Sequence, residues 1–90
     1  MKMKFLTIYR DLAGCKEIEI PAPADMNALI EELSSRYGQP MRCKILSETG
    51  ELLEDAVFLV NGTHISQLAG TATKLTDADS VTLFSAVAGG

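Results

Sequence analysis

The 90-residue sequence predicts one α+β domain in which a single main helix packs on a four- or five-stranded mixed sheet. Two observations lead to this fold class. Short stretches with strand-like alternation or β-branched residues surround one longer stretch whose apolar residues repeat with a helical period. The chain also has neither internal repeats nor a low-complexity linker, and its length is that of one small domain. A domain of this size has a thin core, so we expect no deep substrate cavity formed by this chain alone.

The first two strands are expected to form a β-hairpin. Residues 2–9 alternate between charged and apolar side chains at first and become apolar on both faces further on, as in a central strand. Residues 11–14 supply the turn, in which Gly14 is free to take a positive φ. Residues 17–20 alternate again and stop at Pro21.

The main helix has the clearest boundaries. Asp25 precedes it as an N-cap, and Gly38 ends it at the C′ position. Its apolar side chains form one stripe with the spacing i, i+3, i+4 and i+7, made of Met26, Leu29, Ile30 and Leu33.

The signals between this helix and the next strand are weaker. Residues 41–46 are interpreted as a short helical turn and residues 47–50 as a loop. The β-branched and aromatic stretch 56–60 predicts a buried strand, and Asn61-Gly62 directly after it predicts a tight reversal.

The last part of the chain contains the final strand. Residues 71–73 are interpreted as weakly extended, residues 77–79 as a turn, and residues 80–84 as a strand. The long segment between the first and last strands provides a crossover, so that these two strands can lie side by side and parallel.

Charge excludes some classes of partner. The net charge of −4 and the pI near 4.8 argue against nucleic acid, because phosphate binding needs clustered Lys and Arg. The longest apolar stretches are about as long as residues 56–60, far short of the roughly 20 residues of a membrane span. No apolar signal-peptide segment follows Met1, so a cytoplasmic location with Cys15 and Cys43 reduced is expected.

The negative charge lies in the second half of the chain. Residues 1–45 carry seven basic and six acidic side chains, whereas residues 46–90 carry one basic side chain, Lys74, and six acidic ones. A solvated acidic surface explains this distribution. The alternative is an acidic docking side that steers the chain toward a basic partner.

The residues give little evidence for an active site within the chain. His64 follows the Asn61-Gly62 turn with no cysteine or carboxylate at ligand or triad spacing, so it is interpreted as a surface residue. Asp77 and Asp79 have the spacing of a possible acid–base pair, but a solvated turn explains them better. Neither a phosphate-binding glycine motif nor a metal-ligand cluster occurs. We therefore expect no bound cofactor, no metal and no catalysis by this chain on its own.

The C-terminal pair Gly89-Gly90 remains to be explained. Chance, a frayed terminus and a cloning remnant are the plain explanations. The chemical alternative is that a terminus without Cβ atoms is thin enough to enter a narrow channel in another protein. Its carboxylate would then be the reacting group. Adenylation by ATP would create a leaving group that a sulfur donor displaces, which leaves a terminal thiocarboxylate.

Several stretches carry a resemblance to a known family: Val57 to Gly62, Leu75 to Phe84, and the ending Val87-Ala88-Gly89-Gly90, with Tyr9 to Gly14 in addition. With the order of the predicted elements, they resemble the ubiquitin-like sulfur carriers of the MoaD/ThiS family. The length and the ending are most similar to its molybdopterin synthase small-subunit branch. The resemblance implies a β-grasp fold over residues 1–90, with a flexible tail from about residue 85. One departure is Ser85-Ala86, where the family often carries Pro-Pro, and it predicts a more flexible tail.

The resemblance implies a function for the terminus. Gly90 would be adenylated by an E1-like adenylyltransferase of the MoeB/ThiF type, which uses the ATP, and converted to the thiocarboxylate. Gly89 would provide a thin approach, and Val87 and Ala88 would line the channel entrance. The chain would thus be the sulfur-donating small subunit or co-substrate of a molybdopterin synthase, whose large subunit is of the MoaE type.

The resemblance also implies a partner-binding patch. Phe84 matches a family position that contacts the partner, with a place in the core as the alternative. Phe5 or Leu6 would extend the patch, depending on which face of the first strand is buried.

Other functions share the same fold and terminus, and the sequence leaves them open. In one alternative the thiocarboxylate serves thiamine, cysteine or tRNA thiolation instead of molybdopterin. Gly90 could instead form isopeptide bonds with lysines as a protein modifier. In a further alternative, the domain is an interaction module whose Gly-Gly is incidental.

Overall fold

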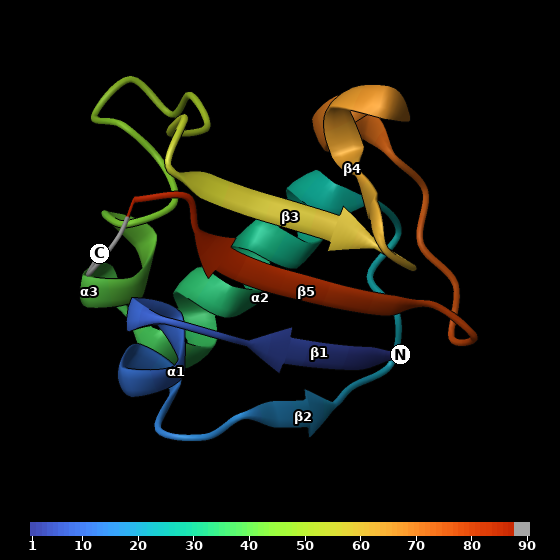
Figure 1. Cartoon of the computed structure of the whole chain (residues 1–90), viewed down its shortest axis with the longest axis horizontal. Helices are drawn as coiled ribbons and strands as arrows, with labels where there is room; N and C mark the ends of the chain where they lie inside the picture. Colours follow the sequence, from blue (N-terminus) through green and yellow to red (C-terminus); the bar gives the residue numbers. More distant parts are fainter. Residues whose placement is uncertain (88–90) are drawn as a thin grey trace.

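The computed structural model describes residues 1–87, which form a five-stranded mixed sheet with one main helix on one face (Figure 1). The strand order is β2-β1-β5-β3-β4. The strands are β1 (Lys2–Phe5), β2 (Glu17–Glu19), β3 (Ala56–Val60), β4 (Thr63–His64) and β5 (Ser80–Ser85). β1 and β5 are parallel at the centre of the sheet, and the other neighbours are antiparallel. The predicted α+β class and the parallel pairing of the first and last strands are confirmed.

The main helix, α2 (Met26–Tyr37), lies where the sequence predicts it. The Asp25 carboxylate accepts a hydrogen bond from the Ala28 N–H at 2.9 Å, which satisfies one of the free N–H groups of the first turn. Gly38 ends the helix with a φ of 78°. The predicted apolar stripe is buried against the sheet, and each fully buried leucine in it contributes about 2–3 kcal/mol relative to an exposed one.

The core lies between α2 and the sheet. The sheet contributes side chains that alternate along the strands, Met3 and Phe5 from β1, Phe58 from β3, and Val81 and Leu83 from β5, all 0% exposed. Phe5 meets the ring of Tyr37 edge to face at a centroid distance of 5.7 Å. The register Phe5 opposite Leu83 opposite Phe58 places these three side chains in one row across the sheet.

The prediction for residues 6–14 is wrong, because the first strand ends at Phe5 and a second helix, α1 (Ile8–Ala13), follows. Thr7 reverses the chain direction with a φ of 53°. In the helix, Tyr9, Leu12 and Ala13 share one inward face at the spacing i, i+3 and i+4. Gly14 takes the predicted positive φ, 75°, but as the C-cap of α1 and not in a hairpin turn.

In the second half of the chain, the strands lie where the sequence predicts them, but the segments between the strands differ from the prediction. The turn after β3 has positive φ at both Asn61 (52°) and Gly62 (85°), as a type I′ turn requires. The short helix α3 (Gln39–Arg42) begins two residues before the predicted helical turn. The expected extended stretch at residues 71–73 is wrong.

Two short 3₁₀ helices, η1 (Ile65–Gln67) and η2 (Gly70–Ala72), connect β4 to the segment before β5. Gly70 has a φ of 59°, and the Thr73 hydroxyl donates to its carbonyl at 2.7 Å. This side-chain hydrogen bond closes a turn and gives the backbone an alternative to an extended conformation.

Candidate functional site

The C-terminal end of β5 lies beside α1 and α3, at the left of Figure 1. The backbone N–H groups of the last described residues are all hydrogen-bonded. Ser85 donates to the Thr7 hydroxyl oxygen at 2.9 Å, Ala86 to the Asp55 carbonyl at 2.9 Å, and Val87 to the Ser85 hydroxyl oxygen at 3.2 Å. Ser85 belongs to β5, so the tail expected from about residue 85 begins with a hydrogen-bonded segment. Of the predicted tail residues, Ala88, Gly89 and Gly90 lie outside the described part of the chain.

A groove of about 230 Å³ borders this point. Its walls come from three parts of the chain: α1, the segments before β3, and the end of β5. They comprise Ile8, Tyr9, Cys43, Lys44, Leu53, Asp55, Ser85 and Val87. The Val87 side chain is 47% exposed beside it. The groove therefore lies where the chain leaves the sheet.

Tyr9 holds one wall of the groove in place. Its ring is 2% exposed, and its hydroxyl donates to the Lys44 carbonyl at 2.8 Å. Burial raises the pKa of Tyr9 to about 12, and the nearby negative charge of Asp55 adds to the increase. The phenol thus stays neutral and serves as a hydrogen-bond donor between α1 and the segment that follows α3.

The face of the sheet opposite α2 carries an apolar patch, which we call the open-face patch and define as Leu6, Val57, Leu59 and Phe84. Val57 is directly opposite Phe84 in the β3–β5 register. Val57, Leu59 and Phe84 alternate along their strands with the buried Phe58 and Leu83, and Leu6 follows the buried Phe5, so the four side chains point away from the core. Val57 is itself only 8% exposed. Phe84 is half-buried, and Leu6 is 47% exposed.

The structure decides two questions that the sequence left open. Phe84 lies on the open face, so its alternative place in the core is excluded. Phe5 is 0% exposed, so its expected part in a surface patch is wrong. The face of β1 that carries Phe5 is the buried one, which leaves Leu6 as the residue that extends the patch.

The acidic side chains of the second half are divided between the two ends of the sheet. Glu48, Glu51, Glu54 and Asp55 lie in the segment before β3. Asp55 lies beside the end of β5, because its backbone carbonyl accepts a hydrogen bond from the Ala86 N–H at 2.9 Å. Asp77 and Asp79 lie in the turn before β5, at its opposite end.

Asp77 and Asp79 have structural roles in the predicted turn. Asp77 accepts from the Ala22 N–H at 2.8 Å. The Asp79 carboxylate accepts from the Asn61 side-chain amide at 2.9 Å and from the Thr76 N–H at 2.8 Å. These hydrogen bonds lower the pKa of Asp79. The two carboxylates bind separate partners, the Ala22 backbone for Asp77 and the Thr76 backbone with the Asn61 side chain for Asp79, as the turn interpretation predicts.

The remaining candidate groups are also accounted for. His64 is exposed on β4, and its Nδ1 accepts from the Ser66 N–H at 3.0 Å, which caps η1. Cys15 is half-buried and Cys43 exposed, and both are free thiols. Among residues 1–87, no group of three or more His, Cys, Asp or Glu side chains is arranged to hold a metal ion. Within the same part of the chain, no helix combines the length and apolar character needed to cross a membrane.

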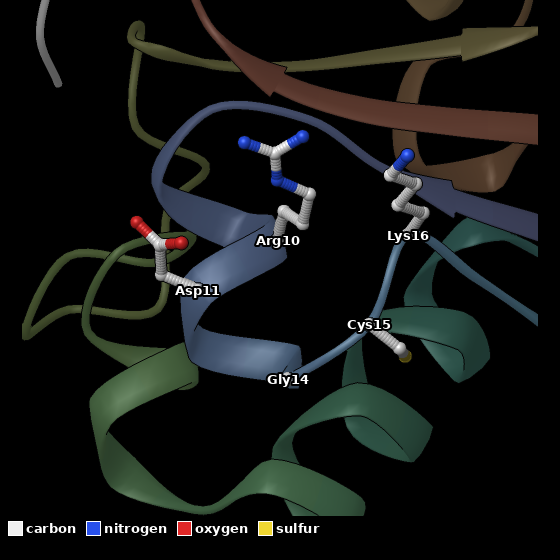
Figure 2. A pocket seen from close by; sticks show the side chains of 5 residues that line it. All are labelled: Arg10, Asp11, Gly14, Cys15 and Lys16. Carbon is white, nitrogen blue, oxygen red and sulfur yellow. The ribbon is translucent and has the colours of Figure 1, made fainter.

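A second depression, of about 360 Å³, lies at the C-terminal end of α1 and is lined by Arg10, Asp11, Gly14, Cys15 and Lys16 (Figure 2). The Arg10 and Lys16 side chains extend to the same side, while Cys15 points away from them. It shares no lining residue with the groove beside β5. Its side chains do not form a nucleophile–base pair, so we do not assign it to the site.

Sequence reasoning missed Thr7 and Ser85, which fix the end of β5. The available signal was Gly14, which is typical of a helix C-terminus, together with the spacing of Tyr9, Leu12 and Ala13. A helix over residues 8–13 would have placed Thr7 at the junction between β1 and α1. The contact from Thr7 to Ser85 spans 78 residues and has no local signal.

Comparisons with known proteins agree with this geometry. A model of the ThiS family matches residues 3–90. The chain is 32% identical to small archaeal modifier protein 3 of Haloferax volcanii over 93 residues, which cover 100% of this chain and 98% of that protein. The crystal structure of Mycobacterium tuberculosis CysO superimposes with a TM-score of 0.80 at 27% identity, covering 96% of this chain and 98% of CysO. A Pyrococcus furiosus protein assigned as molybdopterin converting factor subunit 1 gives a TM-score of 0.70 at 29% identity, covering 96% and 95%.

Proposed function

The chain belongs to the ThiS family, whose fold is ubiquitin-like, and from this membership we propose that it is a sulfur carrier for molybdopterin biosynthesis. In this proposal the carboxylate of Gly90 is adenylated and then converted to a thiocarboxylate. In the first step pyrophosphate leaves ATP. A sulfide-level nucleophile from the sulfur donor then attacks the carbonyl carbon, so one C–S bond forms as the C–O bond to the phosphate breaks and AMP leaves. The thiocarboxylate sulfur then attacks a pterin precursor, and hydrolysis of the acyl C–S bond leaves the sulfur on the pterin and returns the carboxylate.

The observation that carries the proposal is the position of β5. This central strand ends beside a groove at one end of the molecule, and two glycines close the sequence five residues after Ser85. Glycines have no side chain, so such a segment can enter a narrow channel. The reactive group is thereby presented to another protein, and the catalytic groups belong to that partner.

The open-face patch provides the docking surface in this proposal. Phe84 of this patch lies on β5, the strand that leads to Gly90, and Val57 and Leu59 lie on the neighbouring strand β3. Contiguous apolar side chains on a protein surface are typical of interaction sites. The proposed partners are an E1-like adenylyltransferase of the MoeB/ThiF type and a large synthase subunit of the MoaE type. ATP is bound and used by the activating enzyme, so this chain needs no cofactor of its own.

The similarity to a small archaeal modifier protein favours a second candidate function. In this alternative the activated carboxyl of Gly90 forms an isopeptide bond with a lysine amine of a target protein, and AMP leaves. Both candidates begin with adenylation of the same terminus, and they differ in the nucleophile that follows.

One experiment tests both candidates. The untagged chain is incubated with ATP, a sulfur donor, the activating enzyme of its own host and a protein extract of that host as the source of target lysines, and intact masses are measured. A carrier becomes heavier by the difference between one sulfur and one oxygen atom, whereas a modifier yields conjugates of high mass. A chain lacking Gly90 is the control, and it is expected to remain folded because the described core ends at Leu83. If the full chain gains neither mass, both candidate functions fail.

A further inference from the structure

Three consecutive backbone N–H groups are bound where the chain leaves the sheet. The acceptors come from three places: the Thr7 side chain, the Asp55 backbone and the Ser85 side chain. The Ser85-Ala86 pair has no ring that restricts φ, as proline would have. In this chain the hydrogen bonds therefore restrict the backbone at the start of the C-terminal segment.

Of these three contacts, the one made by Thr7 joins the residues that are farthest apart in the sequence, and the backbone of Thr7 is strained. It has a φ of 53° and a ψ of −138°, a combination that a β-branched residue rarely adopts. Its hydroxyl donates to the Leu6 carbonyl at 2.7 Å and accepts from the Ser85 N–H at 2.9 Å. The hydroxyl thus joins the end of β1 to the end of β5. Strain of this kind persists only where the surrounding structure holds it, and it is most common at functional positions.

We propose that Thr7 is a positioning residue for the chemistry at Gly90, and that its hydroxyl fixes the point and direction at which the C-terminal segment leaves β5. This inference rests on the proposed function, because it concerns delivery of the same terminus. When a partner docks on the open-face patch, the segment that leads to Gly90 starts from a fixed position at the end of β5. Without the Thr7 contact, the backbone of residues 85–87 samples more conformations. The entropy lost when one of them is selected then raises the free energy of the reactive complex.

Three substitutions separate positioning from stability. Thr7→Val keeps the β-branched shape and removes the hydroxyl, and Thr7→Ser keeps the hydroxyl. Thr7→Gly removes the hydroxyl but relieves the backbone strain, because glycine takes positive φ at no steric cost. Thr63→Val is the matched control, since Thr63 lies on β4, away from the end of β5, and its hydroxyl makes no hydrogen bond within residues 1–87.

Three measurements are made on each variant: amide hydrogen exchange at Ser85 by NMR, the kinetics of adenylation by the activating enzyme, and the Tm. In Thr7→Val we expect faster exchange at Ser85 and a fall in kcat of about three- to tenfold, the effect of one hydrogen bond. KM stays near that of the wild type because the docking patch is intact. Thr7→Gly is expected to show the same loss of kcat with a Tm at or above that of the wild type. Thr7→Ser and Thr63→Val remain within about twofold of the wild type.

The inference is overturned if Thr7→Val keeps wild-type exchange at Ser85 and wild-type kcat. It is also overturned if kcat falls only in variants whose Tm falls, because the hydroxyl would then serve stability alone. A wild-type chain that is not adenylated contradicts the proposed function instead. In that case the exchange rates still decide whether Thr7 fixes the end of β5.

Discussion

The Tyr9 hydroxyl holds the groove wall beside the end of β5, and Tyr9→Phe removes it. The ring stays in the core, but the Lys44 carbonyl loses the donor that lies 2.8 Å away. A lost hydrogen bond of this kind costs about 1–1.5 kcal/mol in the free energy of unfolding at neutral pH. For a domain of this size, that corresponds to a fall in Tm of roughly 4–12 °C.

The same substitution predicts a distinctive pH dependence. The pKa of Tyr9 rises from 10.0 to about 12 in the folded chain, so folding favours the neutral phenol. Because the folded pKa lies above the unfolded one, this stabilisation is fully present below pH 10 and is lost as the pH rises through 12. The pKa difference corresponds to a ceiling of roughly 2–3 kcal/mol, of which about half is lost by roughly pH 11.

Wild type and Tyr9→Phe should therefore approach equal stability near pH 11. Urea unfolding followed by circular dichroism at pH 7, 10 and 11 measures the difference between the two. Tyr37→Phe is the matched control, since Tyr37 does not contact Lys44 through its hydroxyl and its removal should leave the Tyr9 effect in place. A difference that stays constant from pH 7 to pH 11 would refute the link between burial, pKa and stability.

Substitutions at three further positions test the scaffold. Asp25→Ala removes the N-cap of α2 and should lower the free energy of unfolding by about 1 kcal/mol in urea titrations, whereas Asp25→Asn should keep most of it. Leu33→Ala opens a cavity at a side chain that is 0% exposed and should cost about 2–5 kcal/mol by the same assay; a cost below this range would mean that the core collapses around the site. Asn61→Gly keeps the positive φ of the turn but loses the side-chain bonds to Asp79 and Ser80, so its Tm should lie between those of wild type and Asn61→Ala.

Elements defined by neighbouring residues were predictable from the sequence. The N-cap Asp25, the apolar stripe and Gly38 mark α2 within fourteen residues, and Asn61-Gly62 marks the type I′ turn directly. Helix α1 was not predictable in the same way, because Tyr9 fits both the strand and the helix period. The contact that selects the helix is made with Lys44, which is 35 residues away.

The same distinction between local sequence signals and tertiary contacts applies to the candidate site. The chemistry at Gly90 stays a prediction from the C-terminal residues and from the family resemblance, since residue 90 lies outside the described part of the chain. The face that carries the patch was not predicted, because Phe5 and Leu6 are both apolar and alternation alone cannot tell which one is buried. The contact between Thr7 and Ser85 depends on tertiary structure throughout, since it requires a positive φ that no threonine adopts by preference.

The central pairing of β1 with β5 has a consequence for synthesis of the chain. Residues 2–5 remain without their inner neighbour until residues 80–85 have been made, and β3 waits for the same strand. A ribosome that stalls before β5 thus releases a product whose sheet has no centre, and such a product is expected to be degraded before it folds. Every molecule with a complete sheet carries the strand that leads to the C-terminal segment. A complete sheet therefore forms only in chains that have been translated through β5, because chains that end earlier lack its central strand.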